Sequence, residues 1–132
     1  QGHVAGVGFG LDLTKRETQT KLKAAGLPWE RSKAFTGSAI FSEFVTAPDT
    51  LTQLGVELRV DDVLRQKGDV SLMLYPPEVM LAELRHFLIL EDFDIVMTGT
   101  PAGVGAVRAG ERFHGRVLDG ERELVSGAWV AR

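Results

Sequence analysis

The chain has 132 residues, of which 44% are hydrophobic and 25% charged, with no cysteine and a formal net charge of −3 at pH 7. These values are typical of a soluble globular protein, and we expect residues 1–132 to form one α+β domain in the cytoplasm. The small negative charge gives no basis for binding nucleic acid or an anionic membrane, the absence of cysteine excludes thiolate metal sites, and no apolar run reaches the length of a membrane span.

The first predicted element is a glycine-lined strand that ends at Asp12. Read alternately, one face carries apolar side chains, and the other carries three glycines followed by the carboxylate (Val7, Phe9, Leu11 and Leu13 against Gly6, Gly8, Gly10 and Asp12). Glycines on one face of a strand suggest that another group approaches the backbone closely. A carboxylate at the end of such a face could hold a metal ion or a polar ligand, so we expect the chemistry here.

A helix is predicted directly after this strand. Thr14 and Glu17 have the spacing of a capping box, and Gly26 predicts a helix end near Ala25. Arg16 and Gln19 then lie on one helix face near Asp12, and the stiff segment that follows could return Lys33 to the same corner. Two interpretations stay open from the residues alone: a site for a metal and an anionic substrate, or a simple salt bridge between Asp12 and Arg16, which the residues alone favour.

The rest of the chain predicts short strands and one further helix. Ser38–Val45 is compatible with a strand, and Phe93–Thr98 has the composition of a buried strand. Two hairpins are expected around the turns Asp61-Asp62 and Asp119-Gly120, and Pro76-Pro77 starts a second helix. The strands predicted for the hairpins are Gly55–Val60 with Val63–Gln66, and Phe113–Leu118 with Leu124–Val130. The pattern is β-rich, without a βαβ series.

Two other groups of residues have the composition of binding sites. The glycine-rich loop from Met97 to Gly105 offers backbone N–H groups and two hydroxyls that could hold an anion, but it lacks the Gly-Lys-Ser/Thr of a phosphate-binding P-loop. Glu121 and Glu123 lie on one face of a strand and could both reach a metal ion. They stand beside a tight turn, where solvated charges are common, and we favour that interpretation.

Three ordered blocks resemble the fumarylacetoacetate hydrolase family over nearly the whole chain. They are Gly8–Gln19, Gly26–Phe35 with its Lys-Ala-Phe, and Thr98–Gly105. The resemblance is nearest to short single-domain members that act as acylpyruvate hydrolases, oxaloacetate decarboxylases and related isomerases. It implies a mixed β-sheet roll with about two helices, Mg²⁺ or Mn²⁺ as cofactor, a small 2-oxo acid as substrate, and a homodimer.

The resemblance also implies roles for individual residues. Asp12 matches one of three carboxylate ligands of the metal, and Lys33 and Arg16 match residues that add positive charge at the reacting end of the substrate. Gln19 and Thr100 match residues that hold the substrate. The implied reaction is the metal-dependent cleavage of a C–C bond adjacent to a 2-oxo acid.

The family pattern is not complete in this sequence. In the family, a Glu-x-Glu segment and a His/Glu pair lie upstream of the aspartate strand, and this sequence begins after both. We therefore expect an N-terminally incomplete catalytic domain that lacks a competent metal site by itself. Two alternatives remain: a catalytically silent member, and a small anion-binding module that uses Thr98–Gly105.

Overall fold

The computed structural model describes residues 3–132, which contain eight β-strands, two α-helices and two short 3₁₀ helices. The chain divides into two compact units. One unit comprises Gly10–Phe41, and the other comprises the residues before Gly10 together with Ser42–Arg132. The β-rich composition with two α-helices confirms the predicted fold class, and each strand pairing among the described residues is antiparallel.

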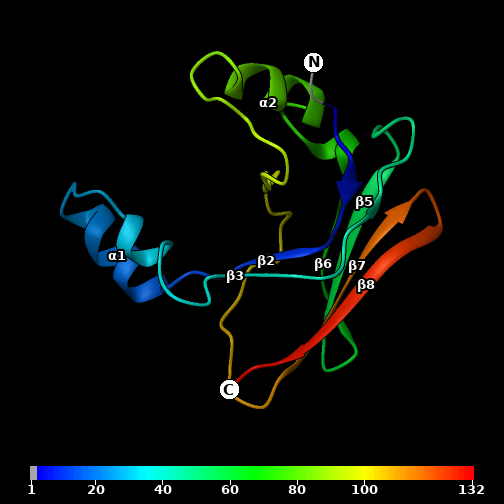
Figure 1. Ribbon diagram of the computed structural model, residues 1–132. Helices are drawn as coiled ribbons and strands as arrows, with labels where there is room; N and C mark the ends of the chain where they lie inside the picture. Colours follow the sequence, from blue (N-terminus) through cyan, green and yellow to red (C-terminus); the bar gives the residue numbers. More distant parts are fainter. Residues whose placement is uncertain (1–2) are drawn as a thin grey trace. The chain divides into compact units, whose positions relative to one another are not determined.

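The larger unit is built on a four-stranded antiparallel sheet with the strand order β6-β5-β7-β8 (Figure 1). Its strands are β5 (Leu54–Val60), β6 (Val63–Asp69), β7 (Arg112–Asp119) and β8 (Arg122–Val130). Both predicted hairpins are confirmed. Asp61 and Asp62 take left-handed conformations with φ of 48° and 65°, which aspartate tolerates better than most residues and which the tight turn between β5 and β6 requires.

One face of this sheet carries the apolar core. Leu58 and Val60 of β5 and Phe113 and Val117 of β7 are all buried there. Gly115 lies opposite Leu58 in the ladder, and a Cβ at this glycine would overlap the ring of Phe9, which occupies the space that the missing side chain leaves. The Phe9 ring also stacks on Trp129, with 6.1 Å between the ring centroids. The prediction that Phe9 faces a packing surface is confirmed.

The glycine-lined segment forms two short strands instead of one. β1 (Gly6–Val7) pairs with β4 (Val45–Thr46) in the larger unit, and β2 (Gly10–Asp12) pairs with β3 (Ala39–Phe41) in the smaller one. Both predicted strands, the glycine-lined one and Ser38–Val45, are interrupted, and the two interruptions lie next to each other at Phe9 and Ser42. There, the Ser42 hydroxyl accepts a hydrogen bond from the backbone N–H of Phe9, and the backbone N–H of Ser42 donates one to the carbonyl of Phe9, each at 2.9 Å.

The smaller unit contains α1 (Arg16–Ala24) and the 3₁₀ helix η1 (Glu30–Ser32). The capping box predicted for this helix is wrong. Lys15 occupies the N-cap position without a side-chain hydrogen bond, and the Thr14 hydroxyl is buried without a partner. The helix begins one residue later than the box requires, and the backbone N–H of its N-cap residue Lys15 donates to the carbonyl of Ser32 in η1 at 2.9 Å. The predicted helix end is confirmed, and Gly26 has a φ of 64°.

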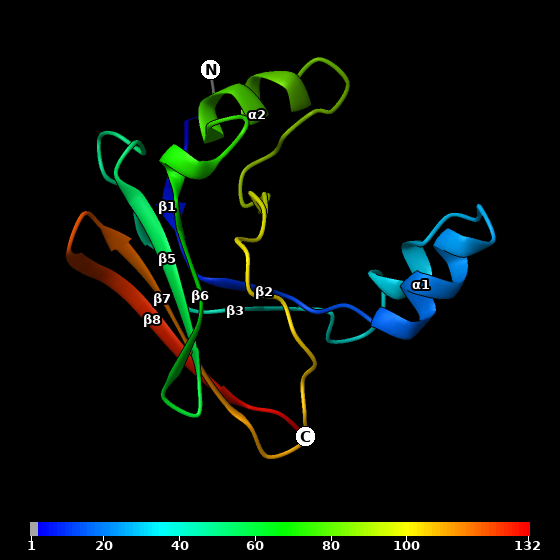
Figure 2. The ribbon, with the colours of Figure 1, turned by 180° about the vertical axis from the view of Figure 1, so that it is seen from behind.

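The second helix, α2 (Pro77–Leu84), begins at the predicted proline pair, after the 3₁₀ helix η2 (Val70–Leu72). No helix of the described residues is long and apolar enough to cross a membrane. The strand predicted for Phe93–Thr98 is not formed, and Phe93 is fully exposed with a φ of 74°. A strand requires a partner for its backbone groups, and within residues 3–132 this segment has none. Figure 2 shows it as plain coil between α2 and β7.

Candidate functional site

The smaller unit brings Asp12 and Lys33 into direct contact. Asp12 is the last residue of β2, and Lys33 Nζ lies 2.7 Å from its Oδ2 atom. Both side chains are about one-third exposed, at 38% and 32%, so this ion pair is open to a ligand. The prediction that Lys33 returns to the strand-to-helix corner is confirmed.

The backbone around Ser32 holds Lys33 in this position. Ser32 is fully buried, its carbonyl accepts a hydrogen bond from the N–H of Lys15, and its own N–H donates to the carbonyl of Trp29 at 3.0 Å. Two cations of the same region also lie over aromatic rings: Lys15 is 4.6 Å from the centroid of Phe35, and Lys23 is 4.4 Å from that of Trp29. These contacts fasten η1 and the following residues to α1, so that the Lys33 side chain starts from a fixed backbone.

Arg16 lies near the start of α1 but does not form the predicted salt bridge with Asp12. Its Nη1 donates to Oε1 of Gln19 at 3.4 Å, one helical turn further along, and Asp12 is paired with Lys33 instead. Gln19 is buried, while Arg16 is exposed. The simple salt bridge between Asp12 and Arg16 is therefore wrong. The smaller unit carries Asp12, Lys33, Arg16 and Gln19 on β2, α1 and the end of η1.

Thr100 belongs to the larger unit, in a loop that lies against the edge strand β6. Gln66 of β6 donates from Nε2 to the carbonyl of Pro101 at 3.0 Å, and a Cβ at Gly68 would lie 2.8 Å from the Pro101 ring. Gly103 has a φ of 104° and packs so closely on the carbonyl of Arg65 that no side chain fits there. Sequence reasoning missed Gln66 and Gly68 as supports of this loop, because the predicted strand ends at Gln66, whereas β6 extends to Asp69 and includes Gly68, and a glycine inside a strand is a signal of close backbone approach.

Part of the glycine-lined face is covered by the chain itself. A methyl group at Gly8 would lie 3.1 Å from Cδ1 of Phe44 and 3.1 Å from the carbonyl oxygen of Glu43. The close approach predicted for this face is therefore confirmed at Gly8, and the approaching group is an aromatic side chain of the same unit. The open part of the segment is its last residue, Asp12, which is exposed.

Glu123 takes part in a row of charges across the sheet. It lies 3.4 Å from Nη1 of Arg116, whose Nη2 lies 2.6 Å from Oε2 of Glu57, and Lys67 Nζ is 3.0 Å from the other oxygen of Glu57. Glu57 is buried, and its hydrogen bonds from Arg116 and then from Lys67 hold the pKa of its carboxyl below the usual value. The same contact with Glu57 raises the pKa of Arg116. Glu123 is thus a partly exposed ion-pair partner of Arg116, whereas the interpretation favoured from the sequence is a solvated charge.

These residues do not provide a complete set of ligands for a divalent metal ion. Residues 3–132 contain no group of three or more His, Cys, Asp or Glu side chains placed to hold an ion. Mg²⁺ prefers about six oxygen ligands in octahedral geometry, and Asp12 offers one carboxylate, already paired with Lys33. The described residues alone therefore do not fit the ion, and Asp12 is at most one of its ligands.

The fold and these residues define a member of the fumarylacetoacetate hydrolase family. The family model described as fumarylacetoacetate (FAA) hydrolase C-terminal matches residues 1–126, and the chain belongs to this family. Among curated proteins, it is 39% identical over 129 residues to the mitochondrial oxaloacetate tautomerase FMP41 of Saccharomyces cerevisiae, an alignment that covers 92% of this chain and 50% of that protein. The chain thus spans about half the length of the curated relatives it matches.

Solved structures show the same fold. The yeast protein ynq8, a fumarylacetoacetate hydrolase family protein, superposes with a TM-score of 0.90 and 35% identity over 97% of this chain and 56% of its own. The fumarylpyruvate hydrolase of Pseudomonas aeruginosa, solved in complex with Mn²⁺ and pyruvate, gives a TM-score of 0.83 and 36% identity over 98% of this chain and 56% of its own. The predicted family and β-rich fold are therefore confirmed.

Proposed function

We propose that this chain carries the substrate-binding residues of a divalent-metal-dependent enzyme that cleaves the C–C bond adjacent to a 2-oxo acid. The reaction is either the hydrolysis of an acylpyruvate or a decarboxylation of the oxaloacetate type. The observation that carries the proposal is the contact of 2.7 Å between Lys33 and Asp12 at the open end of β2. Membership in the family and the likeness to a hydrolase solved with Mn²⁺ and pyruvate support it.

Each residue of the smaller unit has a distinct task in this proposal. A 2-oxo acid presents a carboxylate beside a carbonyl oxygen, and negative charge collects on that oxygen when the neighbouring C–C bond breaks. A fixed cation at this point lowers the barrier, because it stabilises charge that develops in the transition state. Lys33 supplies the cation, and Asp12 holds its ammonium group in place. Arg16 and the amide of Gln19 orient the substrate carboxylate.

Metal dependence belongs to the proposal as well. Asp12 is the candidate ligand on this chain, and we place the remaining ligands on polypeptide outside residues 3–132, since the described residues contain no group of three or more His, Cys, Asp or Glu side chains that could hold the ion. Mn²⁺ in the Pseudomonas relative and the preference of such ions for oxygen ligands support this assignment.

A second candidate function is the keto–enol tautomerisation of oxaloacetate. It is favoured by the yeast relative, whose name is oxaloacetate tautomerase. Tautomerisation moves one proton between C3 and the oxo oxygen and breaks no C–C bond, yet it develops negative charge on the same oxygen. Lys33 and Arg16 would therefore serve both reactions, and only the product distinguishes them.

The products identify the reaction directly. Oxaloacetate and acetylpyruvate are incubated with the protein in Mg²⁺, in Mn²⁺ and in EDTA, while pyruvate, CO₂ and the enol absorbance are followed. Release of pyruvate that requires the metal supports C–C cleavage, whereas a metal-dependent change of the enol absorbance alone supports tautomerisation. If neither pyruvate, CO₂ nor a change of the enol absorbance is detected, the catalytically silent alternative is supported. This result must hold for the chain alone and for its mixture with a polypeptide that corresponds to the unmatched half of the curated relatives.

A further inference from the structure

An apolar surface surrounds α2 and the segment that follows it. Most of the exposed large apolar side chains of the described residues lie between Leu72 and Met97, and Ile89, Phe93 and Leu74 are at least 90% exposed. Folded proteins rarely expose continuous apolar patches of this kind unless another surface covers them. The surface is therefore a candidate for an interface.

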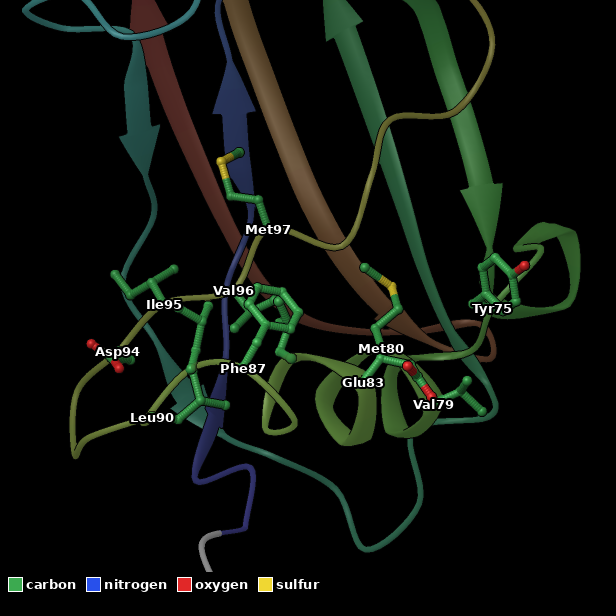
Figure 3. A pocket seen from close by; sticks show the side chains of 12 residues that line it. Tyr75, Val79, Met80, Glu83, Phe87, Leu90, Asp94, Ile95, Val96 and Met97 are labelled. Carbon is green, nitrogen blue, oxygen red and sulfur yellow. The ribbon is translucent and has the colours of Figure 1, made fainter. Parts of the chain in front are cut away.

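A groove of about 660 Å³ runs through the middle of this surface. In Figure 3, Met80 and Phe87 extend from α2 and the turn after it towards the segment that carries Val96, which forms the opposite wall. Apart from the carboxylates of Glu83 and Asp94, the groove is lined by apolar and aromatic side chains. Such a lining favours an apolar occupant.

The helix α2 is only partly covered by the rest of residues 3–132. Of its eight residues, Pro77 is the buried one, although mid-helix positions include Val79, Met80 and Leu81. A short helix in a protein is stabilised mainly by burying its apolar side chains, and those of α2 are only partly covered within residues 3–132.

The segment Phe93–Thr98 has the pattern of a strand without a neighbour. Phe93, Ile95 and Met97 are exposed and Val96 is half-buried, and no ladder joins this segment to another strand among the described residues. Backbone N–H and C=O groups in an extended segment pair readily with an added strand. The exposed apolar side chains and the lack of a ladder at residues 95–98 among the described residues together point to a missing partner strand.

We propose that the groove and Phe93–Thr98 form the docking surface for a polypeptide related to the half of the curated relatives that this chain does not match. The occupant would place apolar side chains against α2 and pair one strand with Phe93–Thr98. Two observations favour it. The yeast structure superposes with a TM-score of 0.90 on 97% of this chain but extends well beyond it, and this chain covers 50% of the curated yeast tautomerase.

A second copy of this chain fits the surface less well. A symmetric dimer through the groove would bring Glu83 and Asp94 of one copy towards the same carboxylates of the other, and like charges in a desolvated interface are unfavourable. The proposal depends on the exposed apolar surface and on the share of the relatives' length that this chain matches. It does not depend on the proposed activity, so it is tested by binding alone.

The test uses the unmatched half of the yeast tautomerase as a purified polypeptide, mixed with this chain. Native mass spectrometry is expected to give a 1:1 complex, and hydrogen exchange at residues 93–98 is expected to be fast in the chain alone and slowed in the complex. Ile95→Lys should weaken the complex at least tenfold. Val63→Lys is the matched control, because Val63 is similarly exposed (59% against 50% for Ile95) but lies at the hairpin between β5 and β6.

Both substitutions are at exposed positions, and unchanged thermal unfolding of each variant shows that the fold is retained. Four results would overturn the proposal: no complex, a homodimer that protects residues 93–98, slow exchange of these residues in the chain alone, or equal binding by the Ile95→Lys and Val63→Lys variants.

Discussion

Lys33 Nζ lies 2.7 Å from Asp12 Oδ2, although 21 positions separate the two residues in the chain. The pair stands at the end of β2, beside the first turn of α1 that carries Arg16. It places a fixed cation next to the carboxylate proposed as a metal ligand. The proposed chemistry of the protein depends on this pair, and its members can be altered separately.

Removal of the Lys33 charge should slow the reaction. We expect Lys33→Met to lower kcat about 100-fold or more, as for the loss of one group that stabilises transition-state charge. Lys33→Arg should restore part of the rate, because the charge is kept but its geometry changes. The measurement is steady-state turnover of the 2-oxo acid. Lys21→Met, on the exposed side of α1, is the control and should retain the full rate.

Arg16 should act mainly on substrate binding. A charged hydrogen bond to a carboxylate contributes about 1.5–3 kcal/mol, so we expect Arg16→Met to lower kcat/KM about 10- to 100-fold. Most of the change should appear in KM. Arg31→Met provides the control, since Arg31 is exposed in η1. Equal kinetic effects of the two substitutions would contradict the role of Arg16.

Arg116 should contribute strongly to stability. It neutralises the buried Glu57 through two hydrogen bonds of 3.0 and 2.6 Å. Arg116→Met leaves that carboxylate with Lys67 alone, and we expect a clear fall in the midpoint of urea denaturation. Arg122→Met removes an exposed ion pair of 3.5 Å with Asp119 and should change stability by less than about 0.5 kcal/mol.

Stability should also fall in acid through Glu57. The pKa of this carboxyl is lowered in the folded state by hydrogen bonds from Arg116 and Lys67. A lowered folded pKa means that the stabilisation is fully present above the ordinary value of 4.5 and is lost as the pH falls through the folded pKa. Urea midpoints between pH 7 and pH 3 should therefore decrease more steeply for the wild type than for Glu57→Gln. Parallel curves would contradict this assignment.

Gly103 should fix the loop that carries Thr100. Gly103→Ala places a methyl group against the carbonyl of Arg65 at a φ of 104°, whereas Gly105 has nothing within 4 Å of an added Cβ. We expect faster hydrogen exchange and proteolysis of residues 98–108 in Gly103→Ala and no change in Gly105→Ala. If both variants behave alike, the loop is not held by its contact with β6.

Local signals in the sequence predicted the elements that depend on local geometry. Asp61-Asp62 and Asp119-Gly120 specify the tight turns of both hairpins, and Gly26 ends α1. The Thr14 capping box is not formed because the helix begins one residue later, with Lys15 at the N-cap and its backbone N–H bonded to Ser32, which is distant in sequence. Composition correctly indicated an apolar segment at Phe93–Thr98, but a strand forms only where a neighbour pairs with it.

The candidate site, too, could be predicted from the sequence only where local signals decide its geometry. The corner of Asp12 with Lys33 was indicated by a stiff intervening segment, and the family blocks supplied the roles of these residues. The competing salt bridge with Arg16 could not be ruled out by spacing, since both cations can reach a carboxylate and only the folded backbone around Ser32 decides between them. The contact of Glu57 with Arg116 spans 59 positions and has no local signature.

The most direct measurement is the metal-dependent release of pyruvate by the wild type and by Asp12→Asn, each mixed with the complementary polypeptide. Because Asp12 is the candidate ligand on this chain, we expect turnover by the wild type in Mn²⁺ or Mg²⁺, none in EDTA, and at least a 100-fold loss in Asp12→Asn even at saturating metal. Equal turnover by wild type and Asp12→Asn in saturating metal would contradict the central claim.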